Sequence, residues 1–199
     1  MKTAILFVTH IYNEDIKRQI VKLYEETKDF ATLYVGFQAD KVRITLPDGI
    51  RSFPFTVKGL NRLGYRSWGC TLMDGNFHFV MLDFYLKHTG CDYYWLIEYD
   101  VRFNGDWKNY FEFFADKDDD FISAHIGDFS GDTRWTRWKE IELVNIKLNH
   151  KMLLRSFNPI CRISNRALAL GHERCKLGDR GHYEVLLPTL FKYLSLIHI

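Results

Sequence analysis

The sequence predicts an α/β domain built on an open, mostly parallel sheet with helices on both faces. Residues 5–9 and 31–37 are short apolar runs, as expected for strands that are buried on both sides. Between them, Asn13 is placed to cap a helix whose apolar residues recur at helical spacing. Strand, helix and strand within about 35 residues form a βαβ unit, which requires a parallel pair of strands.

The alternation of strands and helices continues along the chain. An apolar stripe predicts a helix over residues 73–86, and the run YYWLI predicts a central strand over residues 93–97. Further strands are predicted at 121–126 and 157–163, further helices at 107–114, 165–170 and 183–193, a hairpin or edge excursion at 42–56, and a loop at 61–69. Pro159 places the strand at 157–163 at an edge or a bend.

Length and composition fit a single domain over residues 1–199. Apolar residues make up 47% of the chain, which excludes a disordered protein, and residues 194–199 are expected to be an unstructured or non-native tail. The net charge of +2 comes from basic and acidic residues spread along the chain. Because no block of Lys and Arg is present, we expect no nucleic-acid partner.

The cysteines and the apolar segments predict the cellular compartment of the protein. The four cysteines lie far apart without a CxxC pair, which excludes a standard zinc knuckle and indicates free thiols in a reducing compartment. The N-terminal apolar run is too short for a signal peptide. No stretch approaches the roughly 20 apolar residues of a membrane span. We therefore expect a cytoplasmic protein with no membrane span.

Two carboxylates, Glu98 and Asp100, follow the apolar strand at 93–97 with one residue between them. In open α/β sheets, ligands bind beyond the carboxyl ends of the strands. Residues i and i+2 of a strand share a face, so both carboxylates can bind one Mn²⁺ or Mg²⁺ ion that bridges phosphate oxygens. The alternative interpretation is a charged pair that only marks the surface end of a strand.

The order of elements, together with Glu98-Tyr99-Asp100, resembles glycosyltransferases of the GT-A fold, which is a Rossmann-like architecture. In that superfamily an Asp-x-Asp motif binds the metal ion and the diphosphate of a nucleotide diphosphate-sugar. The resemblance implies the same role for Glu98 and Asp100, although Glu98 stands where the motif has Asp. It covers most of the chain in the order of elements, and in motif only this segment and residues 181–190.

The segment GHYEVLLPTL at residues 181–190 resembles the acid-bearing helix start of inverting GT-A enzymes, notably the branching N-acetylglucosaminyltransferases and their plant relatives. There a glutamate deprotonates the acceptor hydroxyl, which implies that Glu184 is the catalytic base. The same resemblance implies that His182 is a metal ligand or a phosphate donor. The alternatives are an acid favoured by the helix dipole at Glu184 and a structural His182.

Five further residues complete the predicted site. His10 and Asn13 follow the first strand, where GT-A proteins contact the nucleobase and ribose, and Arg162 is a candidate phosphate ligand. Trp135 and Trp138 are candidates for an acceptor platform that stacks on the apolar face of a sugar. The alternatives are a plain helix cap for Asn13 and two tryptophans packed into the core.

The leading functional hypothesis is a metal-dependent glycosyltransferase that moves a sugar from a nucleotide diphosphate-sugar to a hydroxyl acceptor. A non-catalytic carbohydrate-binding protein on a GT-A-like core and a nucleotidyltransferase remain as alternatives. Residues 9–15 contain no glycine, which counts against the Gly-rich loop that a nucleotidyltransferase carries after its first strand. A chain of 199 residues is short for a GT-A enzyme, so the acceptor region is either minimal or completed by a partner chain, including a second copy of this chain.

Overall fold

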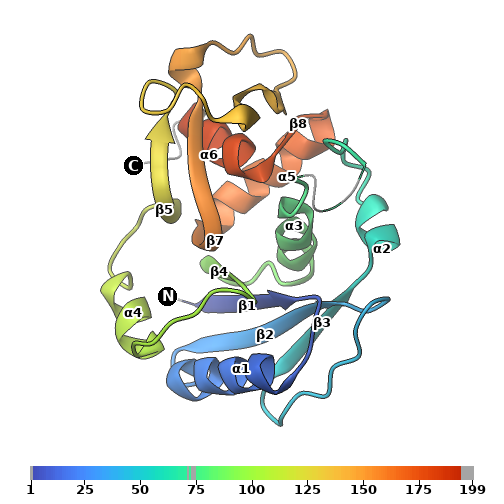
Figure 1. Ribbon diagram of the computed structural model, residues 1–199, viewed down its shortest axis with the longest axis vertical. Helices are drawn as coiled ribbons and strands as arrows, with labels where there is room; N and C mark the ends of the chain where they lie inside the picture. Colours follow the sequence, from blue (N-terminus) through green and yellow to red (C-terminus); the bar gives the residue numbers. More distant parts are fainter. Residues whose placement is uncertain (1, 71, 73–74, 194–199) are drawn as a thin grey trace.

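The computed structural model describes residues 2–70, 72 and 75–193, and its central feature is a six-stranded sheet in the order β3-β2-β1-β4-β7-β5 (Figure 1). The strands are β1 (Thr3–Thr9), β2 (Ala31–Gln38), β3 (Arg51–Phe55), β4 (Tyr93–Glu98), β5 (Phe121–Asp128) and β7 (Leu154–Ser164). The first four strands are parallel to one another. Strand β7 is antiparallel to both of its neighbours, so β5 runs in the same direction as β4. The predicted α/β class with a mostly parallel sheet is confirmed.

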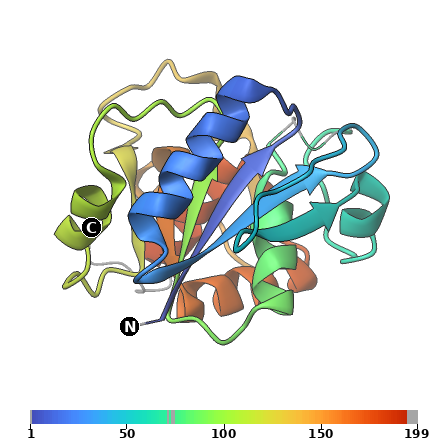
Figure 2. The same ribbon diagram turned by 90° about the horizontal axis from the view of Figure 1, so that it is seen from below.

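Helices cover both faces of this sheet (Figure 2). They are α1 (Glu14–Thr27), α2 (Val57–Asn61), α3 (His78–Lys87), α4 (Trp107–Phe113), α5 (Asn165–Leu177) and α6 (Tyr183–Tyr193). Helices α1 and α4 pack on one face, and α3, α5 and α6 pack on the other. Two 3₁₀ turns (Thr136–Lys139 and His150–Met152) and a small sheet of β6 (Ile141–Glu142) and β8 (Arg180–Gly181) lie beyond the end of β4. None of the described helices is long and apolar enough to cross a membrane.

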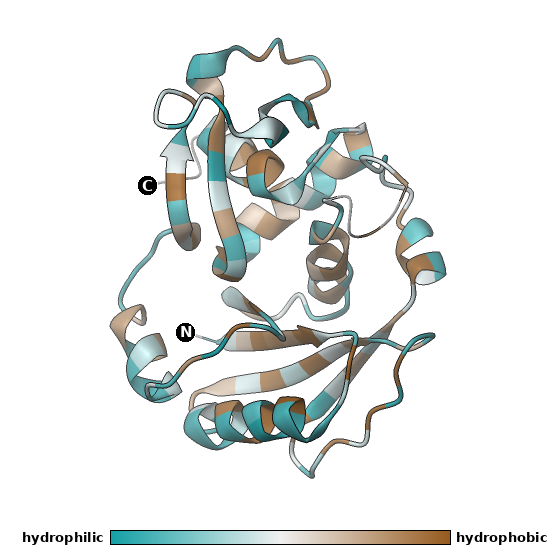
Figure 3. Cartoon of the chain, viewed as in Figure 1, coloured by the Kyte–Doolittle hydropathy of each residue, from teal (hydrophilic) through white to brown (hydrophobic). Residues whose placement is uncertain are grey.

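The alternation of β1 shows why its sequence is continuously apolar. Ala4, Leu6 and Val8 pack in the core cluster that includes α3, α5 and α6, whereas Ile5 and Phe7 pack in the cluster that includes α1 and α4. Successive side chains of a strand point to opposite faces, so a strand covered on both sides needs apolar residues throughout. Figure 3 shows the resulting hydrophobic interior, with a hydrophilic outer side on α1.

Two predictions about strands are confirmed only in one of their alternatives. Of the hairpin or edge excursion expected at 42–56, the hairpin is wrong, because residues 42–50 form no strand and β3 pairs in parallel with β2, but β3 does lie at the edge of the sheet. Ile44 and Leu46 pack against the core on the α1 face, which explains their apolar pattern. Of the edge or bend expected at Pro159, the edge is wrong, because β7 is 11 residues long and lies between β4 and β5. Pro159 is accommodated because the register with β5 shifts between Cys161 and Phe157, so the missing N–H falls at a bulge.

The ends of several helices differ from the prediction. Helix α3 begins at His78, and the expected start at Met73 lies outside the described residues, as does the predicted tail at 194–199. Helix α5 continues to Leu177, where Gly178 adopts a φ of +115° and ends it in a left-handed cap. The short helix α2 was not predicted, whereas α6 has the predicted bounds with Pro188 inside it.

Candidate active site

The acidic end of β4 is formed by a strand residue and a turn residue. Glu98 is the last residue of β4 and follows the alternation of Tyr94 and Leu96, so it lies on the face covered by α6. Asp100 is exposed and lies in the turn that Val101 closes by donating its N–H to the Glu98 carbonyl at 3.0 Å. The expectation that both acids share a strand face is therefore wrong, because the strand ends at Glu98.

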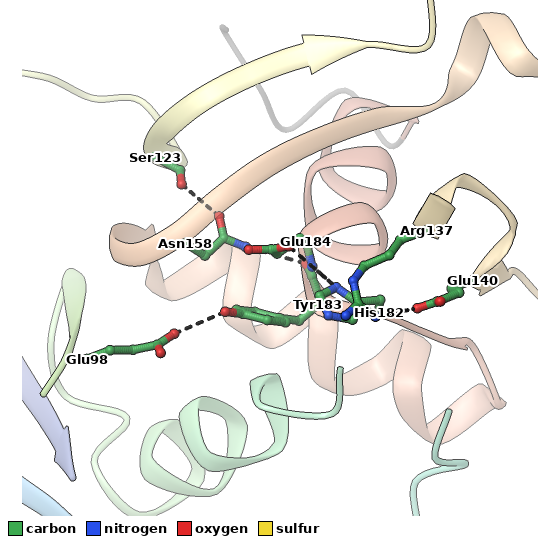
Figure 4. A network of polar contacts seen from close by, with 8 residues as sticks. All are labelled: Glu98, Ser123, Arg137, Glu140, Asn158, His182, Tyr183 and Glu184. Atoms are coloured by element: carbon green, nitrogen blue, oxygen red, sulfur yellow. Dashed lines mark hydrogen bonds and ion pairs between the residues drawn. The ribbon is translucent and has the colours of Figure 1, made fainter. Parts of the chain in front are cut away.

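A hydrogen bond connects this strand end to the start of α6. The Tyr183 hydroxyl donates to Glu98 Oε1 at 3.0 Å, across 85 residues of sequence (Figure 4). The pKa of Glu98 is raised to about 7, chiefly by burial and also by the charges of Asp100 and Glu184, against the opposing effect of the Tyr183 hydrogen bond. The charges of Asp100 and Glu184 therefore both act on Glu98.

Glu184 occupies the first turn of α6, and its side chain is 16% exposed. Burial raises the pKa of Glu184, and the positive charges of Arg137 and Arg155 oppose this effect, as does the backbone N–H of Asn158. Asn158 is fully buried on β7. Its side chain accepts a hydrogen bond from Ser123 Oγ at 2.7 Å and donates one to the Tyr183 carbonyl at 3.5 Å. Strands β5 and β7 thus hold the start of α6 in place.

His182 precedes α6 and acts as its cap. Its Nδ1 accepts a hydrogen bond from the Glu184 N–H at 3.3 Å, and its own N–H donates to the Glu140 carbonyl at 2.8 Å (Figure 4). Burial lowers the pKa of His182 to about 4, so the ring is neutral and Nδ1 is free to accept. The same nitrogen is not available to a metal ion. Within residues 2–70, 72 and 75–193, no group of three or more His, Cys, Asp or Glu side chains is arranged to hold one.

Gly75 fits tightly against the residues that start α6. Its carbonyl accepts a hydrogen bond from the Tyr183 N–H at 2.8 Å, and its φ is +101°. A Cβ at this position would overlap the His182 ring and would lie 2.7 Å from the His182 Cα. The backbone at Gly75 therefore fixes both His182 and Tyr183.

We expect Gly75→Ala to reduce the free energy of unfolding by roughly 2 to 3 kcal/mol, because the substitution combines a left-handed backbone with a close contact. Urea denaturation measures this change. Gly131→Ala is the matched control, since a Cβ there meets only ordinary contacts at 3.7 Å or more and its φ is not positive. Equal losses in the two variants would contradict the role of Gly75.

The two predicted platform tryptophans lie in different environments. Trp138 is 4% exposed, packs with Leu153 and Val185, and donates its Nε1–H to the Asp132 carbonyl at 2.7 Å. Trp135 is partly exposed and meets Trp138 edge-on, with ring centroids 4.9 Å apart. Trp138 is therefore a core residue, and only Trp135 has a ring surface to offer a ligand.

The three remaining candidates lie in three different places. His10 is exposed and contacts the Tyr99 ring edge-on, at a centroid distance of 4.7 Å, beside the turn that carries Asp100. The Asn13 side chain accepts a hydrogen bond from the Ile16 N–H at 3.0 Å, so it is the cap of α1. Arg162 is 2% exposed and donates to the carbonyls of Phe114 and Lys117 on the α4 face of the sheet, opposite Glu98. The structure does not bring Arg162 to the site.

Comparison with known proteins finds likeness among solved structures alone. No protein-family model and no curated protein matches this sequence. Among solved structures, the chain is similar to the apo form of the glycosyltransferase GlyE from Streptococcus pneumoniae TIGR4, with a TM-score of 0.36 and 11% sequence identity. The alignment covers 99% of this chain and 44% of that one, so this chain spans less than half the length of GlyE. The roles assigned to residues here therefore rest on the geometry of this chain.

Four residues of the site were not predicted as functional: Arg137, Arg155, Asn158 and Tyr183. Tyr183 directly precedes the predicted base, and Arg137 lies between the two tryptophans in sequence, so both had a signal in a neighbouring residue. Asn158 stands beside Pro159 in the predicted bend. Arg155 had no such signal, because its charge acts on Glu184 only through the packing of α6 against β7.

Proposed function

We propose that this protein is a glycosyltransferase that moves a sugar from a nucleotide diphosphate-sugar to a hydroxyl acceptor. The observation that supports this most strongly is the Tyr183–Glu98 hydrogen bond, because it brings the start of α6 to the acidic end of β4. The charges of Asp100, two residues away, and of Glu184, 86 residues away in sequence, thereby both act on Glu98. Two of these three carboxylates suit a divalent cation, and the third, Glu184, suits a general base.

Glu98 and Asp100 would hold Mn²⁺ or Mg²⁺ together with the donor diphosphate. Their charges repel each other, which contributes to the raised pKa of Glu98, and a divalent cation would relieve this repulsion. Mg²⁺ is commonly bound by one or two carboxylates plus substrate phosphates, so a third protein ligand such as His182 is not required. When bound, the ion would offset the negative charge that develops on the leaving diphosphate.

Glu184 would accept the proton of the acceptor hydroxyl. A sugar hydroxyl is a poor nucleophile until a base within hydrogen-bond reach takes its proton. Arg137, Arg155 and the Asn158 N–H favour the ionised form of Glu184, which is the form that can accept a proton. If Glu184 is the base, the acceptor attacks from the side opposite the leaving diphosphate, and the transfer inverts the anomeric configuration.

The direct test is a transfer assay on the purified protein. A panel of nucleotide diphosphate-sugars is incubated with hydroxyl acceptors and Mn²⁺, and the release of nucleoside diphosphate is measured together with the mass of the acceptor. We expect release and acceptor glycosylation that both stop when the metal is chelated. Carbohydrate binding without any transfer across the panel would instead favour a non-catalytic role.

Asp100→Asn is expected to weaken Mn²⁺-dependent nucleotide binding by at least ~2 kcal/mol, which is about a thirtyfold loss, while the fold remains intact. The reason is the loss of one charged oxygen ligand on an exposed turn, where no packing is disturbed. Calorimetric titration measures the affinity, and Asp116→Asn is the control because Asp116 is exposed on the loop after α4. Unchanged binding by the Asp100 variant would show that Glu98 and Asp100 only mark the end of a strand.

Metal-dependent nucleotide binding is expected to weaken as the pH falls through about 7, the pKa to which burial raises Glu98. A metal ion needs the ionised carboxylate, so protons compete with it increasingly below this pH. Tyr183→Phe should move the midpoint to higher pH, because the Tyr183 hydrogen bond lowers the pKa of Glu98. Titration of Mn²⁺-dependent binding between pH 5 and 9 measures both midpoints. A parent midpoint near the usual pKa of a glutamate would contradict this account.

A further inference from the structure

The charges of two arginines from different elements act on the proposed base, Glu184. Arg137 belongs to the 3₁₀ turn Thr136–Lys139, and Arg155 lies on β7. The turn is attached to the start of α6 twice: the Glu140 carbonyl accepts the His182 N–H, and Trp138 packs against Val185, the residue after Glu184. Figure 4 shows Arg137 extending toward His182 and Glu184. Arg137 and Arg155 are called the arginine pair below.

Each member of the arginine pair is held by one acidic residue. Arg137 Nη1 donates to Glu140 Oε2 at 3.0 Å, and Arg155 Nη1 donates to Asp132 Oδ2 at 2.8 Å. The Arg155 guanidinium also lies over the ring of Trp135, 5.6 Å from its centroid. Each guanidinium is therefore held by an ion pair through one of its nitrogens, and that of Arg155 also by contact with the Trp135 ring.

Within the part of the chain that the structure describes, both guanidinium groups keep hydrogen-bond donors for a ligand. A guanidinium carries five N–H donors, and the Asp132 and Glu140 contacts use one donor of each arginine. The side chains are 40% exposed at Arg137 and 30% exposed at Arg155, so both reach solvent. Guanidinium groups with free N–H pairs match the geometry of carboxylates and phosphates.

The negative charge of the site bears on which acceptor these donors bind. Glu98, Asp100 and Glu184 repel any anion that approaches, so a negatively charged acceptor needs cations of the protein close to the reacting hydroxyl. The arginine pair supplies them, because both charges act on Glu184. Trp135 adds a partly exposed ring beside Arg155 on which a sugar ring can stack. A neutral acceptor would need these two charges only to keep Glu184 ionised, and it would leave their remaining N–H donors unused.

We propose that the acceptor is an anionic sugar whose carboxylate or phosphate binds Arg137 and Arg155 while its hydroxyl faces Glu184. This inference rests on the proposed function, since it assigns the acceptor class of the same site. A carboxylate and a phosphate both accept hydrogen bonds from the arginine pair. The test includes one sugar of each kind and so distinguishes the two.

The experiment compares the binding of matched sugars to the full chain by ligand-observed NMR titration without nucleotide. The probes are glucose, glucuronic acid and glucose 6-phosphate. At least one anionic sugar is expected to bind about tenfold more tightly than glucose, which is the size of effect that a hydrogen bond to a charged group produces. The anion that is preferred identifies the source of the charge. Equal affinities, or no binding by any of the three, would overturn the proposal.

Variants connect the preference to the arginine pair. Arg137→Gln and Arg155→Gln are each expected to remove most of the preference for the anionic sugar, whereas Arg134→Gln, an exposed neighbour in the same segment, leaves it unchanged. Arg155→Gln also removes the anchor to Asp132, so its melting temperature is measured, and Arg137→Gln tests the proposal if Arg155→Gln unfolds. A preference that survives Arg137→Gln would restrict Arg137 to keeping Glu184 ionised and would contradict the proposal.

The outcome is distinguishable from a failure of the proposed function. Metal-dependent binding of nucleoside diphosphates is measured on the same preparations. If the nucleotide binds and no sugar preference is found, the acceptor inference fails alone. If an anionic sugar is preferred and no nucleotide binds, the proposed transferase activity fails and the arginine pair remains an anion site.

Discussion

Glu184→Gln is expected to reduce turnover by about 10²–10⁴-fold while nucleotide affinity stays the same, since this is the usual contribution of a general base. The substitution keeps the size of the side chain but removes its ability to accept a proton. Glu184 lies in the first turn of α6, whose start is fixed by His182, Tyr183 and Gly75, so the variant is expected to fold normally. Steady-state kinetics should show the loss in kcat rather than as a rise in KM.

The control for this variant is Glu173→Gln, an exposed acid on α5 that lies outside the proposed site. Its turnover is expected to equal that of the parent protein. Unchanged turnover in Glu184→Gln would remove Glu184 from the mechanism, and with it the argument for inversion. A large rise in KM at constant kcat would instead place Glu184 in substrate binding.

Trp138→Ala is expected to reduce the free energy of unfolding by about 3–5 kcal/mol, the range for truncating a buried aromatic residue. The ring fills the cluster that contains Leu153 and Val185, and its loss leaves a cavity beside the start of α6. It also removes the donor to the Asp132 carbonyl. Urea denaturation followed by circular dichroism measures the change.

Trp135→Ala provides the matched comparison, because the two rings are in contact but Trp135 is only partly buried. Trp135→Ala is expected to reduce the free energy of unfolding clearly less than Trp138→Ala does. Relative to this loss of stability, it is expected to weaken acceptor binding more. If both substitutions cost the same stability, the distinction between a core tryptophan and a ligand-facing one would be wrong.

Local sequence patterns predicted the elements that depend on local forces. The βαβ start, the Asn13 cap and the apolar strand before Glu98 follow from periodicity, helix capping and burial, and all three appear in the structure. Pro159 predicted an edge or a bend, and only the register of β7 with β5 shows that a bulge inside the sheet, and not an edge, accommodates it.

The acidic residues of the candidate site were predictable from the sequence, whereas the contacts that join them were not. Glu98 and Glu184 were identified from the strand end and from a resemblance, but no local signal shows that Tyr183 joins them across 85 residues. Trp135 and Trp138 look alike in sequence and pack against the same cluster, and only their burial in the structure distinguishes them. The resemblance implied that His182 is a metal ligand or a phosphate donor. Local sequence does not show which partner its Nδ1 takes, and in the structure Nδ1 accepts the Glu184 N–H.

The most direct test of the proposed active site is calorimetric titration of the full chain with a panel of nucleoside diphosphates, with and without Mn²⁺. If Glu98 and Asp100 hold a metal ion on the diphosphate of a donor, at least one nucleotide binds with Mn²⁺ present, and its binding is lost when the metal is removed. Nucleotide binding that does not depend on the metal, or no binding across the panel in either condition, would contradict the proposed site.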